Sequence, residues 1–214
     1  MTTLADILRG IEQGVFPAPD LTTSVVPAPS ARDTCVIGLT GHLVVAADVP
    51  PEWIAEHLDP TDLAAPLNPP FLHALEQFTG REVNGIDAML LAPALTDDSE
   101  RAELLAGLTP FTDESHPRIR RARRYRDEVR AYTTSSGGLV LTGLGLAGRQ
   151  EVALEVLESS RGRGVGRQLA QAARALVPAG THIWAQVTPG NAASLRMFLA
   201  AGYVPVGSEA LLVR

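Results

Sequence analysis

The stretch Arg161-Gly-Arg-Gly-Val-Gly-Arg167 decides the fold of this chain, because it joins a strand pattern to a helix pattern. Before it, Val152, Leu154 and Val156 alternate with acidic or small residues, which is the period of a strand with one buried face. After it, apolar and small residues recur at helical spacing up to Leu176. Glycines let the backbone approach a ligand, and the free N–H groups at the start of a helix attract anions. With three arginines in the loop, the sequence predicts a phosphate or pyrophosphate site.

Glycine-rich loops also serve nucleoside triphosphate and dinucleotide sites, and the sequence argues against both. All 18 basic residues are arginine, so the lysine of the nucleoside triphosphate loop is missing. A dinucleotide site needs an acidic residue roughly 20 residues further on, at the end of the next strand. That strand, Thr181–Val187, carries Gln186 near its end and is followed by Thr188.

A second motif follows this strand, Asn191-Ala-Ala-Ser-Leu-Arg-Met-Phe-Leu-Ala-Ala-Gly-Tyr203. Arg-x-x-Gly-x-Gly opening one helix and Asn-x-x-Ser-x-x-x-Phe-x-x-x-Gly-Tyr opening the next resemble the GNAT superfamily of acyl-coenzyme A-dependent N-acyltransferases. The clear resemblance covers residues 150–206, and a looser one extends back to residue 115. It implies an α/β (α+β) fold with a central mixed, mostly antiparallel twisted sheet flanked by helices, here with an enlarged N-terminal portion.

The resemblance also implies how acetyl-coenzyme A, the co-substrate, would bind. The loop would hold the coenzyme A pyrophosphate, the backbone of the preceding strand would pair with pantetheine, and the second helix would approach the coenzyme with an asparagine. The residues to which these roles transfer are Leu154, Val156, Arg161, Arg163, Gly164, Val165, Gly166, Arg167, Asn191 and Ser194.

Amine acylation needs a base that deprotonates the nucleophile. Glu151 and Glu155 share one face of the strand before the loop, and in the superfamily a carboxylate near this position often serves as base. Each glutamate is equally well explained as a surface residue or as the partner of an arginine. The superfamily usually has a tyrosine at position 198 to protonate the thiolate, whereas this chain has Phe198.

Composition predicts a cytoplasmic protein without a membrane span. The chain has 214 residues, a formal net charge of −6 and 45% hydrophobic residues. No apolar run reaches the length of a membrane span, and the first residues do not resemble a signal peptide. The single cysteine, Cys35, is expected to be a small buried residue. The five histidines lack metal-ligand spacing, so no metal is expected.

Local patterns predict the elements in chain order. They include a helix capped by Thr3, an extended connection from Phe16 to Ser30 and a helix opened by Asn68 and ended by Gly80. Further predicted elements are a hairpin of strands 34–39 and 42–47, a strand 86–91, a helix 98–106, an antiparallel meander of strands 129–134, 139–146 and 150–157, and a closing hairpin of 203–206 and 210–213.

Two divisions of the chain are compatible with these elements. We divide it into 1–112, a helix, hairpin and helices, and 113–214, the GNAT-like core that binds acyl-coenzyme A. The first part supplies either the opening strand and helices of one enlarged domain, which we favour, or a separate degenerate half.

Seven arginines stand between Arg118 and Arg130 against two acidic residues. Such a patch could bind nucleic acid, but Tyr125 is the only aromatic residue there that could stack on a base, so we favour a solvated face or pairing with carboxylates. The predicted partners are therefore acyl-coenzyme A and an amine acceptor, with no membrane or nucleic acid, and a homodimer is left open. The predicted function is N-acetyl transfer, and the alternative is a non-catalytic acyl-coenzyme A-binding module.

Overall fold

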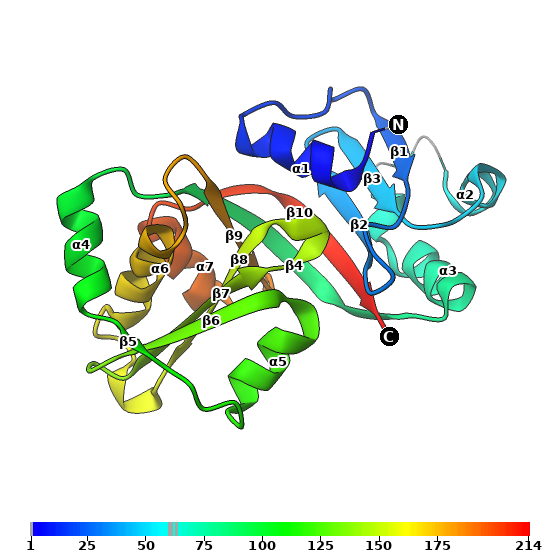
Figure 1. Cartoon of the computed structure of the whole chain (residues 1–214). Helices are drawn as coiled ribbons and strands as arrows, with labels where there is room; N and C mark the ends of the chain where they lie inside the picture. Colours follow the sequence, from blue (N-terminus) through cyan, green and yellow to red (C-terminus); the bar gives the residue numbers. More distant parts are fainter. Residues whose placement is uncertain (1, 60–61, 63) are drawn as a thin grey trace. The chain divides into compact units, whose positions relative to one another are not determined.

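The computed structural model describes residues 2–59, 62 and 64–214, and the chain forms two compact units (Figure 1). The first unit contains Met1–Met89 and Val206–Arg214, and the second contains Leu90–Pro205. Strands β4 (Glu82–Pro93) and β10 (Val204–Val213) each begin in one unit and end in the other. The predicted division after residue 112 is based on the resemblance to the GNAT superfamily and not on the compactness of the folded chain. It stays a prediction.

The first unit opens with helix α1 (Leu4–Glu12), which begins as the sequence predicts. The Thr3 hydroxyl accepts a hydrogen bond from the Asp6 N–H, and the Asp6 carboxylate accepts one from the Thr3 N–H. The apolar side chains Leu4, Leu8 and Ile11 are buried along one face. The predicted capping box is therefore confirmed.

The strands of the first unit run in the order β1, β3, β2, β10, β4. Strands β2 (Thr34–Leu39) and β3 (His42–Ala46) form the predicted antiparallel hairpin. Strand β1 (Thr22–Val26) pairs in parallel with β3 and was not predicted. The prolines on both sides of β1 indicate an irregular segment, and its pairing partner is distant in the sequence, so local patterns miss it.

The predicted hairpin at the C-terminal end is wrong. Strand β10 is continuous and pairs antiparallel with β2, from Ser208 opposite Gly38 to Leu212 opposite Thr34. Gly207, between the two predicted strands, lies against the backbone carbonyl of Gly38, where a Cβ atom would clash. This glycine is thus needed for close backbone approach rather than for reversal of the chain.

Two helices complete the core of the first unit. The side chains of α2 (Pro51–His57) and α3 (Pro69–Thr79) pack on the sheet through Ile54, Leu72 and Leu75. Helix α3 ends at Gly80, whose φ of 63° is left-handed, as predicted. The Asn68 side chain makes no capping hydrogen bond, so that detail of the prediction is wrong.

The second unit contains a mixed sheet in the order β4, β9, β8, β7, β6, β5. Strands β6 (Asp127–Thr134), β7 (Gly138–Leu144) and β8 (Gln150–Val156) form the predicted antiparallel meander, and β5 (Thr109–Pro110) pairs antiparallel with β6. Strand β9 (His182–Val187) runs parallel to β8. A mixed, mostly antiparallel sheet flanked by helices confirms the predicted fold class.

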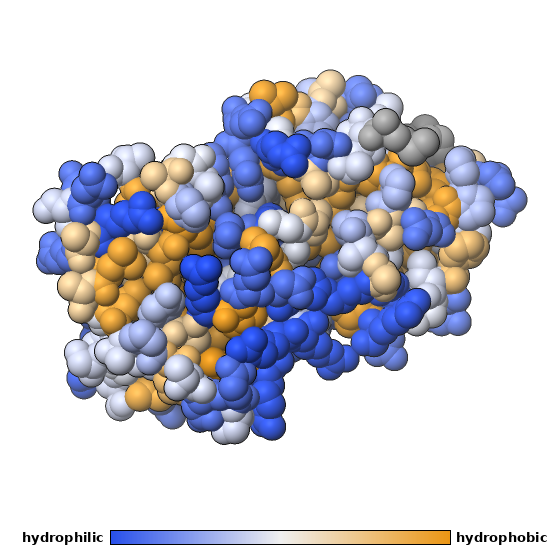
Figure 2. Space-filling model, in the orientation of Figure 1, coloured by the Kyte–Doolittle hydropathy of each residue, from blue (hydrophilic) through white to orange (hydrophobic). Residues whose placement is uncertain are grey.

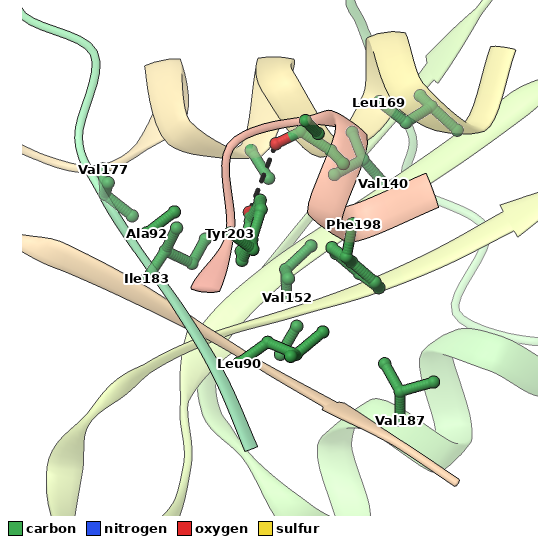
Figure 3. Packing of buried hydrophobic residues seen from close by; sticks show 14 of the residues in the cluster. Leu90, Ala92, Val140, Val152, Leu169, Val177, Ile183, Val187, Phe198 and Tyr203 are labelled. Carbon is green, nitrogen blue, oxygen red and sulfur yellow. Dashed lines mark hydrogen bonds between the residues drawn. The ribbon is translucent and has the colours of Figure 1, made fainter. Parts of the chain in front are cut away.

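Helices cover both faces of this sheet. On one face, α6 (Val165–Leu176) and α7 (Ala192–Ala200) bury Leu169 and Phe198 against Val140, Val152 and other residues (Figure 3). Complete burial of a leucine contributes about 2 kcal/mol. On the other face, α5 (Pro117–Tyr125) packs Ile119 and Ala122 on the alternate strand residues Leu139, Leu141 and Ala153.

The remaining helix, α4 (Asp98–Ala106), has the predicted bounds and packs beside α6. Among the described residues, each helix is too short or too polar to span a bilayer.

Candidate functional site

The glycine-rich loop leads directly from β8 into α6 and leaves the start of that helix open. Gly162 and Gly164 have φ values of 73° and 83°, which side-chain-bearing residues rarely adopt. The first helical hydrogen bond runs from the Gln168 N–H to the Gly164 carbonyl at 3.1 Å. Among the described residues, nothing accepts from the N–H groups of 165–167, and no side chain caps Gly164. These N–H groups at the positive end of the helix dipole are therefore available to a ligand.

The arginines of the loop are also available to a ligand. Arg161, Arg163 and Arg167 are exposed, and within the described parts of the chain none of them forms an ion pair or a hydrogen bond through its side chain. Three guanidinium groups beside the open end of a helix form a strongly positive region. A multiply charged anion such as pyrophosphate matches both the charge and the donors.

The second predicted motif lies at the start of α7, which packs beside α6. The Asn191 side-chain oxygen caps this helix by accepting from the Ser194 N–H at 3.1 Å. A Cβ atom on Gly166 would come within 3.3 Å of Met197, so glycine at 166 permits close approach of the two helices. Asn191 is exposed, and the amide nitrogen of its side chain is the group that could reach a ligand.

Strands β8 and β9 are paired at one position among the described residues, Glu151 opposite Trp184. Towards their C-terminal ends no pairing is present, although β8 remains fully paired with β7 on its other side. Leu154 and Val156 lie in this unpaired half of β8, and their side chains pack towards α6. Backbone groups of β8 that face β9 can therefore pair with an extended ligand.

The two candidate glutamates lie on the α5 face of β8 but in different surroundings. Glu155 is partly exposed, and its carboxylate accepts a hydrogen bond from the Nε of Arg118 at 3.0 Å. Glu151 is only 5% exposed. Arg126 and Arg149 each place Nε 2.8 Å from one of its oxygens, although the Arg126 contact is an ion pair without hydrogen-bond alignment.

Further groups hold the Glu151 carboxylate. It accepts hydrogen bonds from the Leu146 N–H at 3.3 Å and from the Gln186 side-chain amide at 3.1 Å. Burial raises the pKa of Glu151, but the charges of Arg149 and Arg126, together with the hydrogen bonds from Arg149 and Leu146, hold the pKa below its ordinary value. Glu151 is therefore a fixed anion inside the unit, and Glu155 is the glutamate that a substrate can reach.

These partners of Glu151 were not found from the sequence. Arg126 follows α5, Arg149 precedes β8 and Gln186 lies in β9, so only the fold brings them together. The one indication in the sequence is Glu151 itself, an acidic residue in a strand with a buried face. A buried charge requires partners, so arginines near it in the fold could have been expected.

The aromatic residues of the second motif belong to the core. Phe198 is buried and contacts the Tyr203 ring edge-on, with centroids 4.9 Å apart (Figure 3). The Tyr203 hydroxyl donates to the Ala170 carbonyl at 3.2 Å, and burial raises its pKa well above the ordinary value. Neither residue is suited to protonate a leaving group at the loop.

Residues 118–125 of the arginine-rich segment lie in α5, whose outer surface is hydrophilic (Figure 2). Three arginines of the segment pair with carboxylates: Arg118 with Glu155, Arg126 with Glu151, and Arg123 with Glu114 at 2.6 Å. This pairing agrees with the favoured interpretation of the segment. In the described ranges, no group of three or more His, Cys, Asp or Glu side chains is arranged to hold a metal ion.

Comparison with known proteins gives one family and several structures. A family model described as FR47-like protein matches residues 149–209. A GCN5-related N-acetyltransferase from Kribbella flavida is 18% identical, with a TM-score of 0.42, over 66% of this chain and 63% of that one. A GCN5-related N-acetyltransferase from Sphaerobacter thermophilus is 14% identical, with a TM-score of 0.37, over 66% and 55%.

This chain thus spans less than two thirds of the length of either structure. No curated protein matches it. The FR47-like match contains both the loop at 161–167 and the motif at 191–203, and that family is related to the GNAT superfamily. Residues 149–209 of this chain are therefore similar to the FR47-like family.

Proposed function

We propose that this protein transfers an acetyl group from acetyl-coenzyme A to an amine of a small molecule or a protein. The observation that carries the proposal is the open start of α6, where three N–H groups without partners lie beside three arginines without carboxylate partners among the described residues. The pyrophosphate of coenzyme A would bind there. The unpaired half of β8 would pair with pantetheine through Leu154 and Val156, and Asn191 and Ser194 would contact the coenzyme from α7.

The chemistry of amine acylation assigns a role to Glu155. The amine nitrogen attacks the thioester carbonyl, the carbon–sulfur bond breaks, and the amine loses one proton. Glu155, directly or through a water molecule, would take that proton as general base. With Phe198 at the position of the usual tyrosine, the leaving thiolate would take a proton from solvent. A thiol with a pKa of about 8.5 is a good enough leaving group for this.

The alternative is a module that binds acyl-coenzyme A without catalysis. The buried Phe198 and Tyr203, which supply no phenol to the site, favour it. Both functions require coenzyme binding, whereas only transfer releases free coenzyme A.

The deciding experiment combines two measurements on the full chain. Calorimetric titration with acetyl-coenzyme A tests binding, and a thiol reagent detects coenzyme A release with a panel of small amines and peptides that carry a lysine or a free N-terminus. Binding with amine-dependent release supports transfer, and binding without release across the panel supports the module. Absence of binding contradicts both.

The loop conformation gives a matched pair of variants. Gly164 and Gly180 both have left-handed φ values, 83° and 78°, and empty space where a Cβ atom would lie. Alanine at either position carries a similar strain of about 1 kcal/mol or more. We expect Gly164→Ala to weaken acetyl-coenzyme A binding by about 10-fold, because relief of the strain turns the N–H groups away from the pyrophosphate.

Gly180→Ala serves as the control, since Gly180 lies before β9 and away from the loop. It should melt at a temperature similar to that of Gly164→Ala and bind the coenzyme like the unmodified protein. Equal affinities for both variants in calorimetry would show that the loop does not hold the coenzyme.

A further inference from the structure

The first unit contains a chain of hydrogen bonds through aspartate, histidine and serine. The Asp20 Oδ1 lies 3.0 Å from the His42 Nδ1. The other ring nitrogen, Nε2, lies 2.9 Å from the Ser24 hydroxyl oxygen. This order places a carboxylate on Nδ1 and a hydroxyl on Nε2, the arrangement that makes a serine nucleophilic. Nothing in the acetyl-transfer proposal uses these residues.

Parallel pairing of β1 and β3 creates this arrangement. Thr22 lies opposite His42 and Ser24 lies opposite Val44, so the serine reaches the imidazole from the neighbouring strand. The His42 side chain is only 7% exposed, whereas Ser24 is half-buried. The imidazole is thus held in place while the hydroxyl remains within reach of solvent.

The loop before β1 holds the aspartate in position. The Asp20 carboxylate accepts from the Thr22 hydroxyl at 2.7 Å and from the Thr22 N–H at 3.0 Å. The Thr22 hydrogen bond, followed by that of His42, lowers the pKa of Asp20 to about 2, so it is a carboxylate at neutral pH. Its Oδ1, which also accepts from Thr22, can then accept the Nδ1 proton of the imidazole.

The backbone at this point is strained. Leu21 has a φ of 64°, which is unfavourable for a leucine, and its N–H donates to the Gly41 carbonyl at 2.8 Å. Pro19 packs against Gly41 so closely that any Cβ atom there would clash. Such strain persists only where the surroundings impose it, and it is concentrated at functional sites.

A pocket of about 450 Å³ adjoins the histidine. It lies within the first unit and is open to solvent, with both polar and apolar walls. Its lining consists of residues 38–43, Leu67, Gly207 and Ser208. His42 is the residue that this pocket shares with the hydrogen-bonded chain, whereas Ser24 and Asp20 are not part of its lining.

We propose that Ser24 is the nucleophile of a second site, which hydrolyses small acyl esters. His42 takes the hydroxyl proton as the Ser24 oxygen attacks the ester carbonyl, and the same proton passes to the departing alkoxide as the ester bond breaks. Water, deprotonated by His42, then attacks the acyl-serine, releasing the carboxylic acid and returning the proton to Ser24. Asp20 orients the imidazole and balances its charge.

The test uses the full chain without coenzyme A, so its outcome does not depend on the acetyl-transfer proposal. Incubation with a fluorophosphonate should label Ser24, as located by mass spectrometry, and p-nitrophenyl acetate should be hydrolysed. Ser24→Ala should abolish the label, and Ser24→Ala and His42→Gln should each lower hydrolysis at least about 100-fold. Asp20→Asn should lower it at least about 10-fold.

Thr23→Val, on the same strand, is the matched control and should retain both activities. Because Ser24→Ala could disturb the sheet, melting curves accompany every variant, and Ser24→Cys offers a second measurement. If the site is nucleophilic, iodoacetamide should alkylate the introduced thiol of a folded Ser24→Cys protein faster than free cysteine by about 10-fold.

Two results would contradict the proposal. A folded protein that the fluorophosphonate leaves unlabelled at Ser24, or hydrolysis that persists in Ser24→Ala, would mean that the three residues only fasten β1 to β3.

Discussion

Replacing Glu155 with glutamine is expected to lower kcat for amine acetylation by about 100-fold or more, with unchanged affinity for acetyl-coenzyme A. Glutamine keeps the size of the side chain and can still accept a hydrogen bond from Arg118, but it cannot take a proton from the amine. The glycine-rich loop proposed to hold the coenzyme is separate from this side chain, because Glu155 faces α5 and the loop leads into α6 on the other face. Steady-state kinetics and calorimetry on the same preparation measure the two quantities.

Glu158→Gln is the matched control, since Glu158 is exposed and lies just beyond the end of β8. It removes the same charge and should leave kcat within about 3-fold. If Glu155→Gln were fully active, the base would be another group or the amine would enter already deprotonated, and the role proposed for Glu155 would be lost.

Replacing Glu151 with glutamine is expected to cost about 3 kcal/mol or more of unfolding free energy. The substitution leaves Arg126 and Arg149 near one another inside the second unit without the carboxylate that balances their charges. Urea denaturation followed by circular dichroism measures this loss. We therefore expect this variant to lose activity largely through unfolding, unlike Glu155→Gln.

The low pKa of Glu151 also sets a pH dependence. Because the pKa is lower in the folded protein than its ordinary value of 4.5, the carboxylate contributes stability above about pH 4.5. That contribution is lost as the pH falls through the folded pKa. The unmodified protein should thus lose stability in acid more steeply than Glu151→Gln. Equal stability of the two proteins at pH 7 would show that the buried cluster is not needed for folding.

Local patterns predicted the meander and the loop before α6 well. Alternation in 150–157 and helical spacing after Gly164 each depend on a few neighbouring residues, and the structure has both elements within a residue or two of the predicted bounds. Glycines with left-handed φ at 162 and 164 confirm that the loop needs that residue type.

Features that depend on distant pairing were not predicted. Strand β10 pairs with β2, which is distant in the sequence, and nothing near residue 207 indicates this pairing. The different surroundings of Glu151 and Glu155 likewise depend on arginines that only the folded chain brings close to them. Asp20, Ser24 and His42 could not be grouped from the sequence, because their proximity requires the parallel pairing of β1 with β3.

The division of the first unit between two stretches of sequence has a consequence for synthesis of the chain. Residues 34–38 of β2 need residues 208–212 of β10 as partners, so the ribosome must synthesise residues 208–212 before this sheet can form. The second unit is continuous from Leu90 to Pro205, and all its strands are available earlier. We expect the newly made chain to fold residues 90–205 first and to hold an unpaired β2 edge until residues 208–212 emerge.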